Sequence, residues 1–270
     1  MKKNSPGCNC CSGCEIGFYG DVIPQVVNAF PDAHGNANVN DAETINEAVW
    51  GSSGNKRLDI FYYGYTFGPD SCDTLVQPFE LVPGVAPGAT ESFSFQLGQF
   101  MATFGGKILC VAENTAPVPD VSVGCWEDED VDTFNAFVSY MFSGVQSIAK
   151  DTNLDLGCQA NTNVVTTHWD PFWQEIISHM NNGVTQINVG GCTEVKRIPN
   201  DGGSLLMSMD DDTKAVIGIE KLGKGYILII GDSNMFDSCI EGGSFEWGEE
   251  QADGNFRTFL GNFCTLHEVK

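Results

Sequence analysis

Short apolar runs alternate along this chain with segments whose apolar residues recur at helical spacing. The apolar runs predict strands over residues 15–21, 58–64, 107–112 and 226–231, with a further short strand over 36–39. Helical spacing predicts helices over residues 22–30, 42–50, 91–104, 130–148, 170–181 and 255–263. Two apolar runs that flank the acidic segment 210–212 predict a β-hairpin over residues 204–209 and 215–221.

This alternation of helices and strands predicts an α/β protein. We expect a three-layer α/β/α sandwich around a mostly parallel central sheet, with the hairpin as a small addition. The run 107–112 is almost entirely apolar, which is typical of parallel strands covered on both faces. Because no Pro-rich or Ser/Gly-rich linker divides the sequence, we expect two parts, a cysteine-rich arm over residues 1–14 and a single domain over 15–270.

The charge of the chain restricts its partners. The formal net charge is −23, from 36 acidic and 13 basic residues. Nucleic acids and anionic membranes bind Lys/Arg-rich surfaces, so we expect neither as a partner and instead expect protein partners or self-assembly. No apolar stretch of signal-peptide length follows Met1, so we expect cytoplasmic synthesis.

Three segments carry a resemblance to a known family. The apolar run 58–65 is followed by a predicted helix and then by Gly105-Gly106 and the run 107–114. Later come Asn182-Gly183-Val184 and the segment 222–236, which reads Leu-Gly-Lys-Gly-Tyr, an apolar strand, then Gly-Asp-Ser-Asn-Met-Phe. In this order the segments resemble the core of class I glutamine amidotransferase-like domains, which have a flavodoxin-like α/β fold.

The chain departs from that family where the chemistry takes place. The resemblance implies a nucleophilic Cys at the turn after the strand 107–112, but Ala112-Glu113-Asn114 stands there. It also implies a later His, but Asp232-Ser233-Asn234 follows the late strand. Because the nucleophile and its base are both missing, we predict a non-catalytic relative that is not an enzyme.

The ends of the predicted parallel strands carry polar residues. Ligands of open α/β sheets bind at the carboxyl ends of the strands, so these residues form the candidate ligand-binding set. A carbohydrate- or small-ligand-binding module is therefore one alternative function, and a hydrolase that uses Asp232 or Ser233 is another. The candidate residues are Tyr65, Glu113, Asn114, Asp232, Ser233 and Asn234.

The N-terminal arm holds Cys8, Cys10, Cys11 and Cys14 in a C-x-C-C-x-x-C cluster. Four thiolates this close are suited to a single Zn²⁺, so zinc is the possible cofactor. The alternatives are disulfides, within the arm or to another chain, and free thiols. The arm also resembles those of uncharacterised bacteriophage virion proteins. We interpret most of the other cysteines, which are spread singly, as core or near-surface thiols in a reducing compartment.

Two further features bear on binding. His168, Trp169 and Trp173 cluster near a predicted helix start, and we interpret them as core contacts, the alternative being an exposed patch that stacks on a sugar or a protein. The Pro-rich segment 65–90 is the preferred partner-binding element. The leading hypothesis from the sequence is a non-enzymatic structural or interaction protein, such as a tail, neck or decoration component of a phage virion.

Overall fold

A computed structural model describes part of the chain. The described residues are 14–18, 23–31, 34–36, 58–64, 93–113, 131–132, 134–138, 146–148, 154–164, 168–197, 204–208, 215–231, 233–236, 238–239, 245–246 and 254–267. The statements below concern these residues.

The centre of the molecule is a run of parallel strands. Its order across the sheet is β2 (His34–Asn36), β1 (Glu15–Phe18), β3 (Ile60–Gly64), β4 (Lys107–Val111) and β11 (Gly225–Ile230). Each neighbouring pair in this run is parallel, with Tyr62 beside Leu109 and Leu109 beside Leu228. Every residue of β3, β4 and β11 is buried. Burial on both faces explains why these three sequences lack polar alternation.

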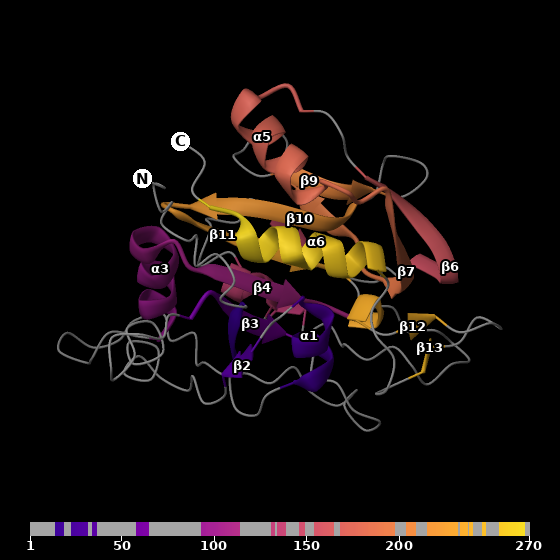
Figure 1. The fold of residues 1–270 in the computed structure, drawn as a ribbon, viewed down its shortest axis with the longest axis horizontal. Coiled ribbons are helices and arrows are strands. Elements are labelled where there is room, and N and C mark those ends of the chain that lie inside the picture. Colours follow the sequence, from indigo (N-terminus) through magenta and orange to yellow (C-terminus); the bar gives the residue numbers. More distant parts are fainter. Residues whose placement is uncertain are drawn as a thin grey trace, which may run out of the picture.

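The sheet continues past β11 with antiparallel strands (Figure 1). Next in order stand β10 (Ala215–Leu222), β9 (Ser204–Ser208), β6 (Leu154–Val164) and β7 (Gln186–Cys192). Off this path, β8 (Val195–Arg197) pairs with β10 and with β5 (Gln146–Ile148). A separate two-stranded sheet joins β12 (Ser238–Cys239) to β13 (Phe245–Glu246).

Helices cover both faces of the parallel strands. The helices of the described residues include α1 (Pro24–Ala29), α3 (Phe93–Phe104), α5 (Pro171–Met180), α6 (Gly254–Thr265) and the 3₁₀ helix η2 (Ser233–Phe236), and residues 131–132 and 134–138 are also helical. Tyr226 and Lys107 contact the C-terminal end of α6, which runs across β10 and β11 in Figure 1. Successive side chains of a strand point to opposite faces of the sheet. Tyr63 points to the face opposite that of Tyr226, and its ring stacks there on Phe137.

The hydrophobic core follows from this layering. Many side chains of the parallel strands, among them Ile16, Phe61 and Leu228, are fully buried. From one covering layer, α6 contributes Phe256, Phe259, Leu260 and Phe263 on one helical stripe. Burying each such side chain stabilises the fold by about 1.5–3 kcal/mol relative to exposure. The aromatic stripe therefore holds α6 firmly on the sheet.

The structure confirms the α/β class with its parallel core and corrects several element predictions. The antiparallel hairpin of β9 and β10 exists, but it belongs to the main sheet and is extended by β6 and β7, which were not predicted. The helix predicted over 130–148 is wrong at its end, because residues 146–148 form β5 against β8. The strand predicted over 36–39 lies earlier, as β2. The helix predicted over 42–50 falls outside the described residues.

Candidate functional site

Two of the segments that carry the family resemblance, 58–114 and 222–236, lie side by side in the sheet. β3, β4 and β11 are consecutive neighbours, with Gly64 beside Val111 and Val111 beside Ile230. Since the strands are parallel, their carboxyl ends meet at one edge of the sheet. Ala112 extends the pairing by donating its backbone N–H to the carbonyl oxygen of Ile230 at 2.8 Å. This edge is the candidate site.

Two of the predicted site residues meet there. The hydroxyl of Ser233 donates a hydrogen bond to Oε2 of Glu113, across 120 residues of sequence. Glu113 is 3% exposed and Ser233 is fully buried. A buried carboxylate needs hydrogen-bond donors to offset its lost hydration, and the Ser233 hydroxyl is one such donor. The two side chains therefore bond to each other at this edge of the sheet.

The backbone packs tightly around this pair. Gly64 ends β3 at φ 128°, a left-handed conformation, and a Cβ there would overlap the carbonyl oxygen of Val111. A Cβ on Gly231 would overlap the carbonyl oxygen of Thr193. Thr193 is fully buried, and its N–H donates to the carbonyl oxygen of Gly231 at 2.8 Å. The segment after β7 thus packs against the end of β11. The sequence did not predict this contact, because it did not predict β7.

The other predicted site residues are not all placed. Tyr65, Asn114 and Asp232 lie outside the described residues. Asn234 belongs to η2. The predicted convergence at the strand ends is therefore seen for Glu113 and Ser233, and the ligand-binding role of the set stays a prediction.

Cys110, next to the position where the family's nucleophile is expected, is buried inside β4. It is a free thiol, and burial raises its pKa well above the ordinary value. Burial, and secondarily Cys110, also raise the pKa of Tyr63. A thiol that keeps its proton is a poor nucleophile, so the geometry matches the interpretation of Cys110 as a small core residue.

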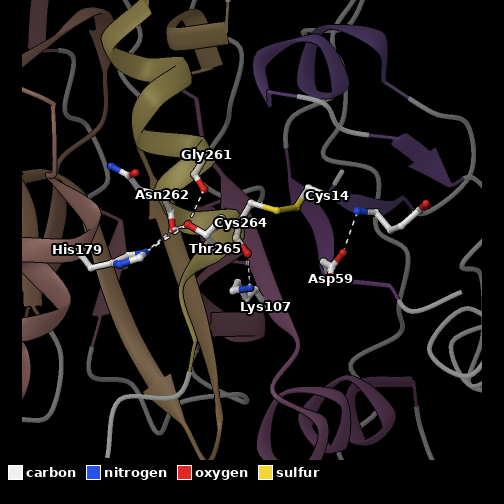
Figure 2. Close-up of a disulfide and its surroundings, with 9 residues drawn as sticks. Cys14, Asp59, Lys107, His179, Gly261, Asn262, Cys264 and Thr265 are labelled. Carbon is white, nitrogen blue, oxygen red and sulfur yellow. Dashed lines mark hydrogen bonds between the residues drawn. A yellow bond between two sulfur atoms is a disulfide. The ribbon is translucent and has the colours of Figure 1, made fainter. Parts of the chain in front are cut away.

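Cys14 forms a disulfide with Cys264 of α6, with their Cα atoms 6.0 Å apart (Figure 2). Cys264 is therefore an exception to the interpretation of most single cysteines as thiols. The disulfide of Cys14 runs neither within the arm nor to another chain, because helix α6 brings the far end of the sequence beside β1. In this state Cys14 is not available to a metal. Cys8, Cys10 and Cys11 lie outside the described residues, where their role stays a prediction.

The aromatic cluster at α5 is divided between core and surface. Trp173 is buried, as predicted, and packs edge-to-face on Phe172. Trp169 is 78% exposed, so its assignment to the core is wrong. Asp170 caps the helix by accepting from the N–H of Phe172 at 2.9 Å, which leaves Trp169 before the first turn, off the inward stripe of α5. The half-buried ring of His168 stacks on Trp169 with centroids 5.5 Å apart.

The described residues offer neither a metal site nor a membrane-spanning helix. No group of three or more His, Cys, Asp or Glu side chains within them is arranged to hold a metal ion. None of the helices found there is long and apolar enough to cross a membrane.

No protein-family model matches the sequence, and no curated protein matches it either. Solved structures do match its fold. The cytoplasmic protein STM1381 of Salmonella typhimurium LT2 aligns over 94% of this chain and 100% of its own, with a TM-score of 0.53 and 10% identity. The cytoplasmic protein STM3548 of Salmonella typhimurium aligns over 95% and 100%, with a TM-score of 0.49 and 7% identity.

A β-galactosidase from Bacillus circulans sp. alkalophilus also matches, at a TM-score of 0.46 and 10% identity. The alignment takes in 93% of this chain but spans only 30% of the galactosidase. At such identities the likeness concerns the fold alone. With β3, β4 and β11 adjacent in one parallel run and a full-length match to the first Salmonella protein, this chain has a class I glutamine amidotransferase-like fold.

Proposed function

We propose that this chain is a non-enzymatic interaction protein, in which an amidotransferase-like scaffold displays a protein-binding surface. The observation that carries the proposal is the buried hydrogen bond between Ser233 and Glu113. It occupies the strand ends, the place where α/β proteins of this kind bind ligands. A fully buried hydroxyl bonded to a carboxylate is not presented to a substrate.

The hydrolase alternative finds little support in these contacts. Nucleophilic serines are activated by an adjacent base, most often a histidine that a third group orients. Of the described histidines, His179 bonds through Nε2 with the carbonyl oxygen of Asn262 on α6, and His168 lies at the start of α5. His34 begins β2, beside Glu15 at the start of β1, and the carbonyl oxygen of His267 lies beside Tyr226 at the start of β11. None of these contacts involves Ser233. The ligand-binding alternative is weakened in the same way, because Glu113 and Ser233 bond to each other.

Trp169 supports the binding half of the proposal. Large aromatic side chains are concentrated at the energetic centres of protein interfaces, and this one is 78% exposed. It is also held in place. The N–H of Asp170 donates to Nδ1 of His168 at 3.0 Å, and the N–H of His168 donates to Oε1 of Gln174 at 2.6 Å. A side chain whose backbone is already ordered loses less entropy on binding.

The interaction is tested by sedimentation velocity over a range of protein and salt concentrations. We expect self-association that strengthens with salt, because screening weakens the repulsion between copies that each carry a charge of −23. Trp169→Ala should weaken it at least tenfold, whereas Glu175→Ala, at an exposed position of the same helix, should leave it unchanged. A monomer in every condition would contradict self-assembly.

The absence of catalysis is tested separately. Purified protein is assayed for ammonia release from glutamine and for hydrolysis of nitrophenyl esters. We expect no turnover above that of Ser233→Ala. Ester hydrolysis that is lost in both Ser233→Ala and Glu113→Gln would overturn the non-enzymatic proposal.

A narrower proposal places this interaction in a phage particle, as a tail, neck or decoration component. It depends on the resemblance of the cysteine-rich arm, most of which lies outside the described residues, and the comparisons with solved structures lend it no support. Immunogold labelling of particles from the native source is the direct test. Unlabelled particles beside a labelled cell extract would remove the virion role and leave the interaction proposal intact.

A further inference from the structure

A disulfide joins residues near the two ends of the sequence. Cys14 directly precedes β1, and Cys264 lies in the last turn of α6, 250 residues later (Figure 2). Cys14 is 2% exposed, whereas Cys264 is only partly buried. Cys264 is therefore the member of the pair that a thiol in solution reaches more easily.

The bond sits at the opposite edge of the sheet from the candidate site. Cys14 precedes β1, and Lys107, which contacts the same helix end, is the first residue of β4. Glu113 follows the last residue of β4. Since β1, β3 and β4 are parallel, the disulfide lies at their amino ends and the Glu113–Ser233 pair at their carboxyl ends. Opening the bond leaves that pair in place.

The body of α6 has its own attachments. Its aromatic stripe is buried. The side-chain amide of Asn262 donates to the carbonyl oxygens of Met180 and Asn182, each at 2.9 Å. The ring of His179 on α5 bonds through Nε2 with the carbonyl oxygen of Asn262 at 2.9 Å. Most of these contacts come before Cys264 in the helix, so they keep the helix docked without the disulfide.

The contacts at and beyond Cys264 are fewer. The ammonium group of Lys107 donates to the carbonyl oxygen of Cys264 at 2.8 Å, and the hydroxyl of Tyr226 donates to that of His267 at a long 3.4 Å. Lys107 is 5% exposed beneath this turn. When the disulfide opens, the last turn of α6 keeps these hydrogen bonds, the 3.4 Å contact between Thr265 Oγ1 and His179 Nε2 and the buried side chain of Leu266, and its movement uncovers a buried cation.

We propose that the Cys14–Cys264 disulfide is a redox-controlled latch on the C-terminal turn of α6. A dithiol reductant opens it: its thiolate attacks Sγ of Cys264, the Cys14–Cys264 bond breaks, and Cys14 leaves as a thiolate that takes up a proton. The second thiol of the reductant then displaces Cys264. The protein gains two electrons and two protons, and the reductant becomes a disulfide. Reaction with an oxidised dithiol reverses these steps.

The size of the chain favours a regulatory disulfide over one that the fold needs for its stability. A domain of more than 250 residues buries enough surface to fold without a disulfide. In reducing compartments the disulfides that do form are mostly transient and redox-sensing. The disulfide joins two segments that the hydrophobic core also holds in place. Breaking it therefore changes the structure near Cys14 and Cys264 and leaves the rest of the fold intact.

The test uses the full chain with Cys8, Cys10 and Cys11 changed to Ser, which keeps arm thiols from exchanging with the latch. The oxidised protein and the protein treated with dithiothreitol are compared by hydrogen–deuterium exchange. We expect exchange to rise at least tenfold in residues 261–267 and 14–18 after reduction, with β4 and β11 unchanged. Maleimide labelling mapped by peptide should modify Cys14 and Cys264 only after reduction.

Cys264→Ser should show the exchange pattern of the reduced protein without any reductant, and Cys110→Ala should retain the oxidised pattern. If Cys264→Ser does not fold, the reduced parent chain still decides the question. A bond that resists dithiothreitol in the native protein would overturn the latch. So would reduction that speeds exchange throughout β4 and β11, because the disulfide would then be a staple of the whole domain.

Discussion

The ammonium group of Lys107 donates to the backbone carbonyl oxygen of Cys264 at 2.8 Å, joining the first residue of β4 to the last turn of α6. The carbonyl belongs to the group at a helix C-terminus that has no partner within the helix. A cation at this position also interacts favourably with the helix dipole. Lys107 is thereby buried at low cost, and Figure 2 shows it beside the disulfide.

Lys107→Met retains the apolar stem and removes the charged donor. We expect a loss of about 1.5–3 kcal/mol in the free energy of unfolding, the usual contribution of a hydrogen bond to a charged group. Urea denaturation measures it. Lys224→Met, at an exposed turn position, is the matched control and should change stability by less than about 0.5 kcal/mol. Equal effects of the two substitutions would show that the Cys264 contact contributes nothing.

Gly231→Ala should destabilise the domain, because the new Cβ overlaps the carbonyl oxygen of Thr193 and lies 3.3 Å from that of Val216. Overpacking of this kind costs about 1–3 kcal/mol. Gly98→Ala makes the same chemical change inside helix α3, where no atom lies within 4 Å of the new Cβ. It should instead stabilise by about 0.5–1 kcal/mol. The midpoint of thermal unfolding should therefore fall in Gly231→Ala and rise in Gly98→Ala. A Gly231→Ala midpoint at or above that of the parent would refute the close approach.

Ser233→Ala and Glu113→Gln form a double-mutant cycle for the closed strand ends. Removing the serine hydroxyl deprives a buried carboxylate of a donor, at a cost of about 1–3 kcal/mol. We expect the double variant to lose less than the sum of the single losses, with a coupling energy of about 0.5–3 kcal/mol from denaturant titrations. Strict additivity would mean that the two side chains do not interact in solution.

Cys110 should make stability fall with rising pH. Burial raises the pKa of its thiol well above the ordinary 9.0, so above that pH the unfolded chain loses a proton that the folded chain keeps. The contribution is fully present below the unfolded pKa and is lost as pH rises toward the folded pKa, by up to about 1.4 kcal/mol per pH unit. Urea denaturation between about pH 8 and 10.5 measures the slope, which should be shallower in Cys110→Ala. Parallel curves for the two proteins would contradict the shift.

The parallel strands could be predicted because a strand buried on both faces is a continuous apolar run in the sequence. Runs such as Ile227-Leu228-Ile229-Ile230 are apolar on both faces, and only a covered strand of a parallel sheet requires that. Asp170 and Pro171 mark the start of α5 by local chemistry, a side-chain cap and a fixed φ at the first turn. The sequence pattern did not predict strand β6, because Asp155, Gly157 and the polar residues 161–163 interrupt its apolar positions.

Other features depended on contacts that no local pattern encodes. Trp169 and Trp173 are the same residue type four positions apart, yet one is 78% and the other 5% exposed, because the helix begins between them. Helical spacing alone places both on one face. The pairing of Cys14 with Cys264 was likewise beyond sequence reasoning, since many pairings among eleven cysteines are compatible with the same sequence.

By itself, the sequence determined the α/β class, the parallel core of the sheet and the lack of a cysteine at the expected turn, because burial patterns and residue identities are local properties. It also predicted that Glu113 and Ser233 lie at the same edge, since parallel strands bring their ends together. Only the tertiary structure decided that these two side chains close on each other, and that Cys14 meets Cys264. Such contacts depend on distances between segments far apart in the chain, which are set by how helices and sheet pack.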